Sequence, residues 1–179
     1  MQKQCEGLIV MDAVVNDLID LFGAPTQWSS GLPEKSLPGK DRPHVFCLNG
    51  MSEFAATLFA LDSAQIRNVA LIGINPTSLS VALSLQQRSF KVSLLPSGRE
   101  TALVQAALQT EEALRALKRN GITYHPFPAT SLQGSQIHCQ SGYCGFICEG
   151  RFIKESEEVG CVVTESGNVY VDAVIIAGT

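Results

Sequence analysis

Residues 68 to 95 read NVALIGINPTSLSVALSLQQRSFKVSLL, and this stretch decides the fold. Val69 to Ile72 is an unbroken apolar run of strand length, Gly73 breaks it, and a helical pattern of apolar residues begins at Thr77. A second apolar strand follows at Val92 to Leu95. A strand, a glycine turn, a helix and a strand within about thirty residues have the size of a βαβ unit. Because both strands are almost continuously apolar, we expect a parallel sheet that is covered on both faces.

The glycine turn stands where a dinucleotide-binding fold has its glycine fingerprint, but two of the three fingerprint glycines are replaced here. In the dinucleotide fingerprint G-x-G-x-x-G, the first glycine makes a tight turn, the second admits pyrophosphate to the backbone, and the third lets the helix pack on the strand. The corresponding residues are Gly73, Asn75 and Ser78. Asn75 tolerates a left-handed conformation, but its side chain occupies space that phosphates would use, and Pro76 removes one N–H. We therefore expect a weakened anion-binding helix terminus.

The end of the second strand lacks the acid that holds the ribose of NAD. In NAD sites, a carboxylate about twenty residues after the turn bonds to the ribose hydroxyl. Here Pro96 takes that place, and Ser97, Gly98 and Arg99 follow. Arg99 with Ser97 would instead meet a 2′-phosphate, which favours NADP over NAD. The alternative is that Arg99 is simply solvated, as most Arg side chains are.

Composition sets the outer bounds of the prediction. The chain has 179 residues and 45% hydrophobic content, which suits one sizeable domain with a flanking arm. A net charge of -4, with 13 Lys+Arg spread thinly, gives no basic stripe for nucleic acid. No apolar run approaches the roughly 18 residues of a membrane span, and the N-terminus lacks a signal-peptide pattern. We expect a cytoplasmic protein that binds neither nucleic acid nor membranes.

Residues 37 to 61 carry a resemblance to a known family. They read LPGKDRPHVFCLNGMSEFAATLFAL. The stretch resembles the segment that leads into the NAD(P)-binding domain of the pyridine nucleotide-disulfide oxidoreductase family, where L-P-G-x-D-x-x-x-V-F-x-L precedes a short helix. Ser52 then fits the N-cap of a helix that runs to about Leu61. The matching positions are Leu37, Pro38, Gly39, Asp41, Val45, Phe46 and Leu48.

The resemblance continues in order to the end of the chain. The pattern of apolar residues predicts one amphipathic helix from Leu103 to Asn120, which Gly121 ends. The third parallel strand is predicted from Ile122 to Phe127. The closing strand, Val171 to Ala177, resembles the D-x-V-I-x-A-x-G ending of the family, with Thr179 where the last glycine would stand. A small antiparallel meander lies between them. Its predicted segments are Ser135 to Cys139, Tyr143 to Ile153, Gly160 to Thr164, and a tight turn at Ser166-Gly167-Asn168.

The resemblance implies an α/β fold of the FAD/NAD(P)-binding type, a Rossmann-like parallel sheet with flanking helices and the small antiparallel meander. We expect an N-terminal arm and linker over residues 1–40 and the NAD(P)-binding-like domain over residues 41–179. Family enzymes insert this domain into an FAD domain whose own glycine fingerprint opens the chain, and none precedes residue 37. We therefore expect a segment of a longer protein. Its FAD would come from a domain outside this chain, and its partners would be other domains, other proteins or a second copy.

Catalytic groups are scarce in this sequence. In the family, a Glu two residues after the third fingerprint glycine often lies near nicotinamide and flavin, and here that position is Ser80. The alternative is a small residue on a buried helix face. His44, His125 and His138 are far apart in the sequence, and none belongs to a His, Asp or Cys constellation that offers an acid, base or nucleophile. We expect no catalytic residue in this domain, where cofactors would carry the chemistry.

Four of the six cysteines lie late in the chain, at Cys139, Cys144, Cys148 and Cys161. Cys139 and Cys144 have the C-x4-C spacing of flavin-linked disulfide reductases, but they follow the βαβ unit in a Gly- and Ser-rich stretch. His138 beside Cys139 fits no common zinc pattern. A redox pair or a metal site is the minor alternative to scattered thiols.

Two functions remain open. The first is an NAD(P)H-binding domain that passes hydride to a flavin held by another domain. The second is a pseudoenzyme domain that binds dinucleotide weakly or not at all and serves as a structural or interaction module. Asn75, Ser78 and Pro96 favour the second, because each removes a different contact. The candidate cofactor-binding residues are Gly73, Asn75, Ser78, Ser80, Ser97 and Arg99.

Overall fold

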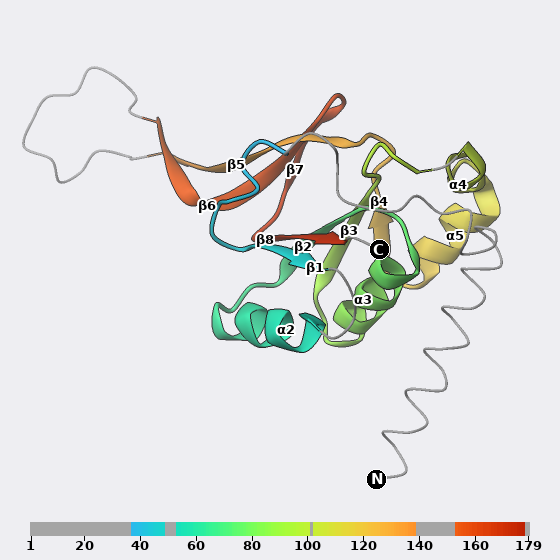
Figure 1. The fold of residues 1–179 in the computed structure, drawn as a ribbon, viewed down its shortest axis with the longest axis horizontal. Helices are drawn as coiled ribbons and strands as arrows, with labels where there is room; N and C mark the ends of the chain where they lie inside the picture. Colours follow the sequence, from blue (N-terminus) through green and yellow to red (C-terminus); the bar gives the residue numbers. More distant parts are fainter. Residues whose placement is uncertain (1–36, 49–52, 101, 139–152, 178–179) are drawn as a thin grey trace, which may run out of the picture.

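The computed structural model describes residues 37–48, 53–100, 102–138 and 153–177. Its main element is a five-stranded sheet in the order β1-β8-β2-β3-β4, in which every neighbouring pair is parallel (Figure 1). β2 is therefore the central strand, with two neighbours on each side. The strands are β1 (Val45–Leu48), β2 (Asn68–Ile72), β3 (Lys91–Leu95), β4 (Ile122–Tyr124) and β8 (Ala173–Ala177).

Helices cover one face of this sheet, and a small antiparallel sheet covers the other (Figure 1). The expected α/β architecture with a meander is confirmed. The helices are α2 (Phe54–Ser63), α3 (Pro76–Gln87), α4 (Ala102–Leu108) and α5 (Glu111–Arg119). The strands of the small sheet, in the order β5-β6-β7, are β5 (Ala129–His138), β6 (Ile153–Thr164) and β7 (Gly167–Tyr170).

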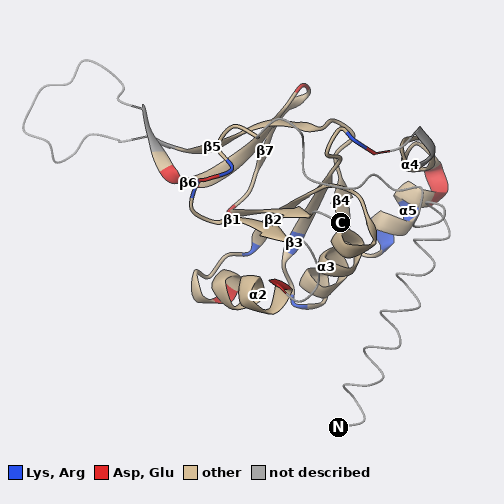
Figure 2. Cartoon of the chain, in the orientation of Figure 1, with Lys and Arg blue, Asp and Glu red and all other residues tan. Residues whose placement is uncertain are grey.

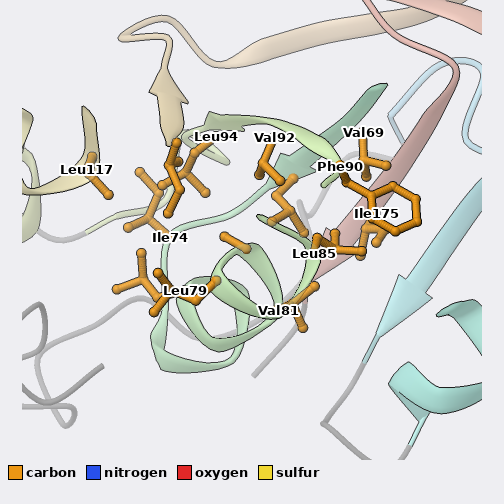
Figure 3. Close-up of a cluster of buried hydrophobic side chains, with 14 of the residues drawn as sticks. Val69, Ile74, Leu79, Val81, Leu85, Phe90, Val92, Leu94, Leu117 and Ile175 are labelled. Atoms are coloured by element: carbon orange, nitrogen blue, oxygen red, sulfur yellow. The ribbon is translucent and has the colours of Figure 1, made fainter. Parts of the chain in front are cut away.

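Successive residues of the central strands alternate between two hydrophobic cores. On β2, Val69 and Leu71 pack with the helices, whereas Ala70 and Ile72 pack with the meander. Because both faces are buried, these strands read as continuous apolar runs rather than as an alternating pattern. Figure 3 shows the helical core, in which side chains of α3 lie against the sheet at Val69, Val92 and Ile175. The labelled α3 residues there are Leu79, Val81 and Leu85.

The single helix expected over Leu103 to Asn120 is wrong, because the chain forms α4 and α5 instead. Thr110 separates them. Its Oγ1 accepts a hydrogen bond from the backbone N–H of Ala113 at 3.3 Å and donates one to the carbonyl of Ala107 at 2.7 Å. Two glutamates follow in the first turn of α5, where carboxylates interact favourably with the helix dipole. Local capping therefore starts a new helix inside one amphipathic pattern.

The meander also differs from its expected segments. β4 ends at Tyr124 rather than Phe127, since Pro126 cannot donate to a ladder. β5 begins at Ala129 rather than Ser135. β6 continues through the stretch expected as a Glu-rich turn, because it pairs with β5 across three register shifts. β7 was not expected as a strand, and the turn before it lies one residue earlier than predicted. β8 begins at Ala173, two residues later than predicted.

Several expectations fall outside the described residues. These are the N-terminal arm up to residue 36, the Ser52 cap, Cys139, Cys144 and Cys148, most of the second meander segment, and the loop after β8. At the start of the described part, Leu37 packs into the meander core, and the carbonyl of Pro38 accepts a hydrogen bond from the Leu132 N–H at 2.8 Å. Within the described parts of the chain, the structure has no helix of the length and apolar character that a membrane span requires.

Gly73 ends β2 in a conformation that requires glycine. Its φ is +102°, and a Cβ atom there would lie 2.9 Å from the carbonyl oxygen of Ala177. Its N–H donates to the carbonyl of Leu95 at 2.9 Å. The turn therefore joins the ends of β2, β3 and β8, and it leaves no space for a side chain.

Gly73→Ala should destabilise the protein more than Gly167→Ala. Gly167 also has a positive φ, +134°, but nothing lies within 4 Å of a Cβ built on it. The control substitution adds backbone strain alone, about 1 to 2 kcal/mol, whereas Gly73→Ala adds the clash with Ala177 and should cost about 3 to 5 kcal/mol. Urea unfolding of both variants measures the difference. Equal losses would contradict the close approach of β8 to the turn.

Candidate functional site

The candidate site lies at the carboxyl ends of β2 and β8. β2 leads through α3 to β3 on one side, while β8 flanks it on the other side. The order of the strands therefore reverses between β2 and β8, and ligands of open α/β sheets bind in the crevice outside such a point. Gly73, Ile74 and Asn75 form the turn there. The side chain of Ile74 lies in the helical core and holds the turn against the sheet (Figure 3).

Asn75 and Ser78 form a reciprocal capping box at the start of α3. Asn75 is extended, with φ −152°, and not left-handed as its tolerance suggested. Its Oδ1 accepts a hydrogen bond from the Ser78 N–H at 2.8 Å, and the Ser78 Oγ accepts one from the Asn75 N–H at 3.0 Å. The two residues at the second and third fingerprint positions are therefore bonded to each other, and each uses a backbone donor of the other.

Few backbone donors remain for a ligand at this turn. The N–H of Ile74 donates to the Glu100 carboxylate at 3.3 Å, and Pro76 has no N–H. Within the described residues, Thr77 is the first-turn residue whose N–H has no protein acceptor. An anion at a helix N-terminus is held by several such donors. One donor makes a much poorer anion site.

Asn75 also bridges the gap between the two strand ends. Its Nδ2 donates to the carbonyl oxygen of Ala177 at 3.2 Å, the same oxygen that approaches Gly73. The side chain is 3% exposed. It fills the crevice between β2 and β8, which is where a dinucleotide would place its pyrophosphate.

The sequence predicts no carboxylate at the end of β3. This prediction is wrong, because the Glu100 side chain folds back and bonds to the residues that follow β3. Glu100 Oε1 accepts hydrogen bonds from the Ser97 N–H at 2.6 Å and the Ser97 hydroxyl at 2.9 Å, in addition to that from Ile74. Its Oε2 accepts one from the Gly98 N–H at 3.0 Å. Glu100 is 4% exposed, so these four donors compensate a buried negative charge.

Sequence reasoning missed Glu100, although the sequence contains a signal for it. Ser97 to Glu100 matches the [ST]-x-x-[EQ] pattern of a capping box, and α4 begins two residues later. The pattern is short and polar, so it looked like an ordinary loop. The contact with Ile74, which is 26 residues away, has no sequence signal at all.

The other predicted residues are Ser80, on α3, and Ser97 and Arg99, in the loop between β3 and α4. Ser80 lies on α3, half-buried, with its carbonyl accepting the Ser84 hydroxyl at 2.8 Å. The Ser97 hydroxyl donates to Glu100, and it also accepts the Arg99 N–H at 3.3 Å. The structure thus brings Gly73, Asn75 and Ser78 together at the turn and places Ser97 beside Glu100.

A cavity of about 660 Å³ opens on the other side of Glu100. It lies between α4, α5 and the ends of β3 and β4, and Glu100, Leu108, Leu114 and Tyr124 are among its lining residues. Burial raises the pKa of the Tyr124 hydroxyl above its usual value, and the negative charge of Glu100 raises it further.

Metal and charge features are sparse in the described part of the chain. No group of three or more His, Cys, Asp or Glu residues there is placed to hold a metal ion. Cys47 is exposed on β1, whereas Cys161 is buried on β6. Lys and Arg are dispersed over several elements rather than gathered on one (Figure 2).

Comparison with known proteins gives matches among solved structures. No protein-family model matches the chain, and no curated protein matches it. A water-forming NADH oxidase from Lactobacillus brevis, solved with NADH, superposes with a TM-score of 0.57 at 13% identity, over 84% of this chain and 29% of that one. An NAD-dependent persulfide reductase from A. fulgidus gives 0.57 at 14% identity, over 84% and 24%. An FAD-dependent pyridine nucleotide-disulphide oxidoreductase from Desulfovibrio vulgaris gives 0.54 at 18% identity, over 84% and 34%.

This chain has the fold of the NAD(P)-binding domain of pyridine nucleotide-disulfide oxidoreductases. The resemblance predicted from residues 37–179 is confirmed at the level of the fold. The chain spans 24% to 34% of the length of these three proteins.

Glu100→Gln should lower the pKa of Tyr124 without returning it to the usual value of about 10. The substitution removes the charge but leaves the burial, which is the larger cause of the shift. NMR titration of ¹³C-labelled tyrosine in a Tyr143→Phe, Tyr170→Phe background isolates the Tyr124 signal. Glu157→Gln, at an exposed position of β6, is the control for removal of a distant charge. An unchanged Tyr124 pKa in Glu100→Gln would show that the two groups do not interact.

Proposed function

We propose that this chain is a degenerate NAD(P)-binding-like domain that binds dinucleotide weakly or not at all. It serves as a structural or interaction module of a larger oxidoreductase-related protein. The observation that carries this proposal is the internal use of the donors at the turn: the side chains of Asn75, Ser78 and Glu100 accept three of its backbone N–H groups. A dinucleotide needs such groups for its pyrophosphate.

Charge supports the same proposal. The Glu100 carboxylate bonds directly to the turn, so a pyrophosphate placed there would meet a buried negative charge. Like charges at such distances disfavour each other strongly when they are shielded from water. A preference for NADP over NAD would depend mainly on Arg99, because the Ser97 hydroxyl is already bonded to Glu100.

The outer face of α2 supports the role as a module. Phe59 is 76% exposed there, and Ala55 and Ala56 beside it are exposed as well, while Phe54 and Leu61 pack into the core. A helix that is apolar on all sides is typically buried on all sides. α2 lies at the margin of the helical layer (Figure 1). We propose that this face packs against another domain of the parent protein.

The alternative is a working NAD(P)H-binding domain that passes hydride to a flavin held by another domain. Two of the matched proteins favour it, because the NADH oxidase and its engineered NADPH-oxidase variant were solved with NADH and NADPH. Thr77 would be the remaining backbone donor for such a cofactor. FAD would come from outside this chain.

Calorimetric titration of the purified chain with NADH and with NADPH separates the two functions. A degenerate site should give no saturable heat up to about 5 mM, a bound of roughly 3 kcal/mol of binding free energy. Saturable binding of either nucleotide below the millimolar range would overturn the proposal in favour of the working domain. Tighter binding of NADPH in that case would assign the preference to Arg99.

The double substitution Asn75→Gly and Ser78→Gly should restore measurable affinity for dinucleotide. It frees two backbone donors and opens the crevice. It should also cost about 1 to 3 kcal/mol of stability, through the lost cap and a glycine inside a helix. The matched control is Thr110→Gly, which removes the α5 cap without touching the turn. A gain in NADH binding by both variants would show that loosening the fold, rather than opening the turn, is responsible.

A further inference from the structure

The cavity beside Glu100 adjoins the glycine turn without including it. Its lining contains Pro96 and Gly98 but none of Gly73, Asn75 and Ser78. Its volume of about 660 Å³ lies within the range of small-molecule sites. It therefore has room for a ligand of its own.

The walls of this cavity are mainly apolar and rigid. Leu108 of α4 and Leu114 of α5 contribute aliphatic surface, and Tyr124 contributes an aromatic ring. Three prolines complete the walls, at Pro96, Pro126 and Pro128. Flat, stiff apolar surfaces of this kind suit a planar ring, because little side-chain freedom is lost when the ring binds.

The charge of the lining has one sign. Glu100 lines the cavity, and the lining contains no Lys, Arg or His. The ion pairs found among the described residues, Arg67 with Asp62 and Arg115 with Glu111, do not include Glu100. Among the residues that the structure describes, the donors to the buried carboxylate are neutral: the N–H groups of Ile74, Ser97 and Gly98 and the Ser97 hydroxyl. An anion would be repelled by the Glu100 carboxylate, whereas a cation would be attracted by it and could also interact with the Tyr124 ring.

Two amides give the cavity a polar edge. Gln105 and Gln109 belong to its lining. The Gln105 Nε2 donates to the backbone carbonyl of Glu100 at 2.9 Å, which fixes the position of this amide. Amide oxygens next to a carboxylate are acceptors for the N–H groups of an amine.

We propose that this cavity binds a small aromatic amine with a single positive charge. The ring lies between the prolines, Leu114 and Tyr124, and the ammonium group lies toward Glu100. The site shares Glu100 with the turn, but none of Gly73, Asn75 and Ser78 lines it, so it can bind a ligand whether or not a dinucleotide binds at the turn. Phosphorylated or carboxylated ligands are excluded from it.

Two probes of the same ring but opposite charge test this proposal on the whole 179-residue chain. They are tryptamine and indole-3-propionate, followed by ¹H–¹⁵N NMR. Tryptamine should bind with a dissociation constant of about 1 mM, as expected for about twelve non-hydrogen atoms. Its shifts should map to Gln105, Leu114 and Tyr124. Indole-3-propionate should bind at least about tenfold more weakly.

Substitutions in the lining separate charge from shape. Glu100→Gln should weaken tryptamine at least about fivefold and narrow the difference between the probes. Leu114→Trp, at a partly exposed position, should fill the cavity and abolish binding of both. Phe59→Ser, on exposed α2 away from the cavity, is the control and should leave tryptamine binding unchanged.

Four results would overturn the proposal. They are the absence of saturable shifts with tryptamine, equal affinity for the two probes, shifts that map outside the lining, and undiminished binding in Leu114→Trp. If Glu100→Gln does not give a folded spectrum, the comparison of probes on the unaltered protein and the Leu114→Trp variant still decide the matter.

Discussion

The pairing of backbone N–H groups at the start of α3 is the constraint on which the chemistry of this domain depends. A buried N–H must find an acceptor, and in a dinucleotide fold the bound phosphates supply part of the acceptors. Here Asn75 and Ser78 accept from each other, and Glu100 accepts from Ile74. The turn is therefore satisfied by the chain itself. These hydrogen bonds would compete with the binding of any phosphate at the turn.

The two replaced glycines form one interaction rather than two separate losses. The Asn75 Oδ1 accepts the Ser78 N–H, and the Ser78 Oγ accepts the Asn75 N–H, so each side chain caps the backbone of the other residue. A glycine at position 78 would remove the second of these bonds. A reciprocal cap of this kind stabilises a helix start by about 1 to 2 kcal/mol. The amide of Asn75 also ties α3 to the end of β8 at Ala177. The crevice that would hold a ligand is thus occupied by the Asn75 side chain, which connects α3 to β8.

The arrangement of layers explains why the remaining chemistry gathers at the carboxyl edge. Helices cover one face of the parallel sheet and the meander covers the other, so neither face is open to a ligand. At the carboxyl edge, the Asn75 side chain fills the crevice between β2 and β8, while a cavity remains near the ends of β3 and β4. Glu100 stands between the two, bonded to the turn and lining the cavity. Its charge therefore bears on both.

The sequence by itself determined the βαβ unit, the parallel sheet and the meander. These depend on local apolar periodicity and on turn residues such as Gly73, which the chain displays over short windows. It did not determine the break between α4 and α5, where the Thr110 cap outweighs a continuous amphipathic pattern, or the length of β6, which comes from pairing with β5. The position of Glu100 and the contact of Asn75 with Ala177 were decided by tertiary structure alone. Both join residues that lie far apart in the chain, and such hydrogen bonds form only after the sheet has brought the strand ends together.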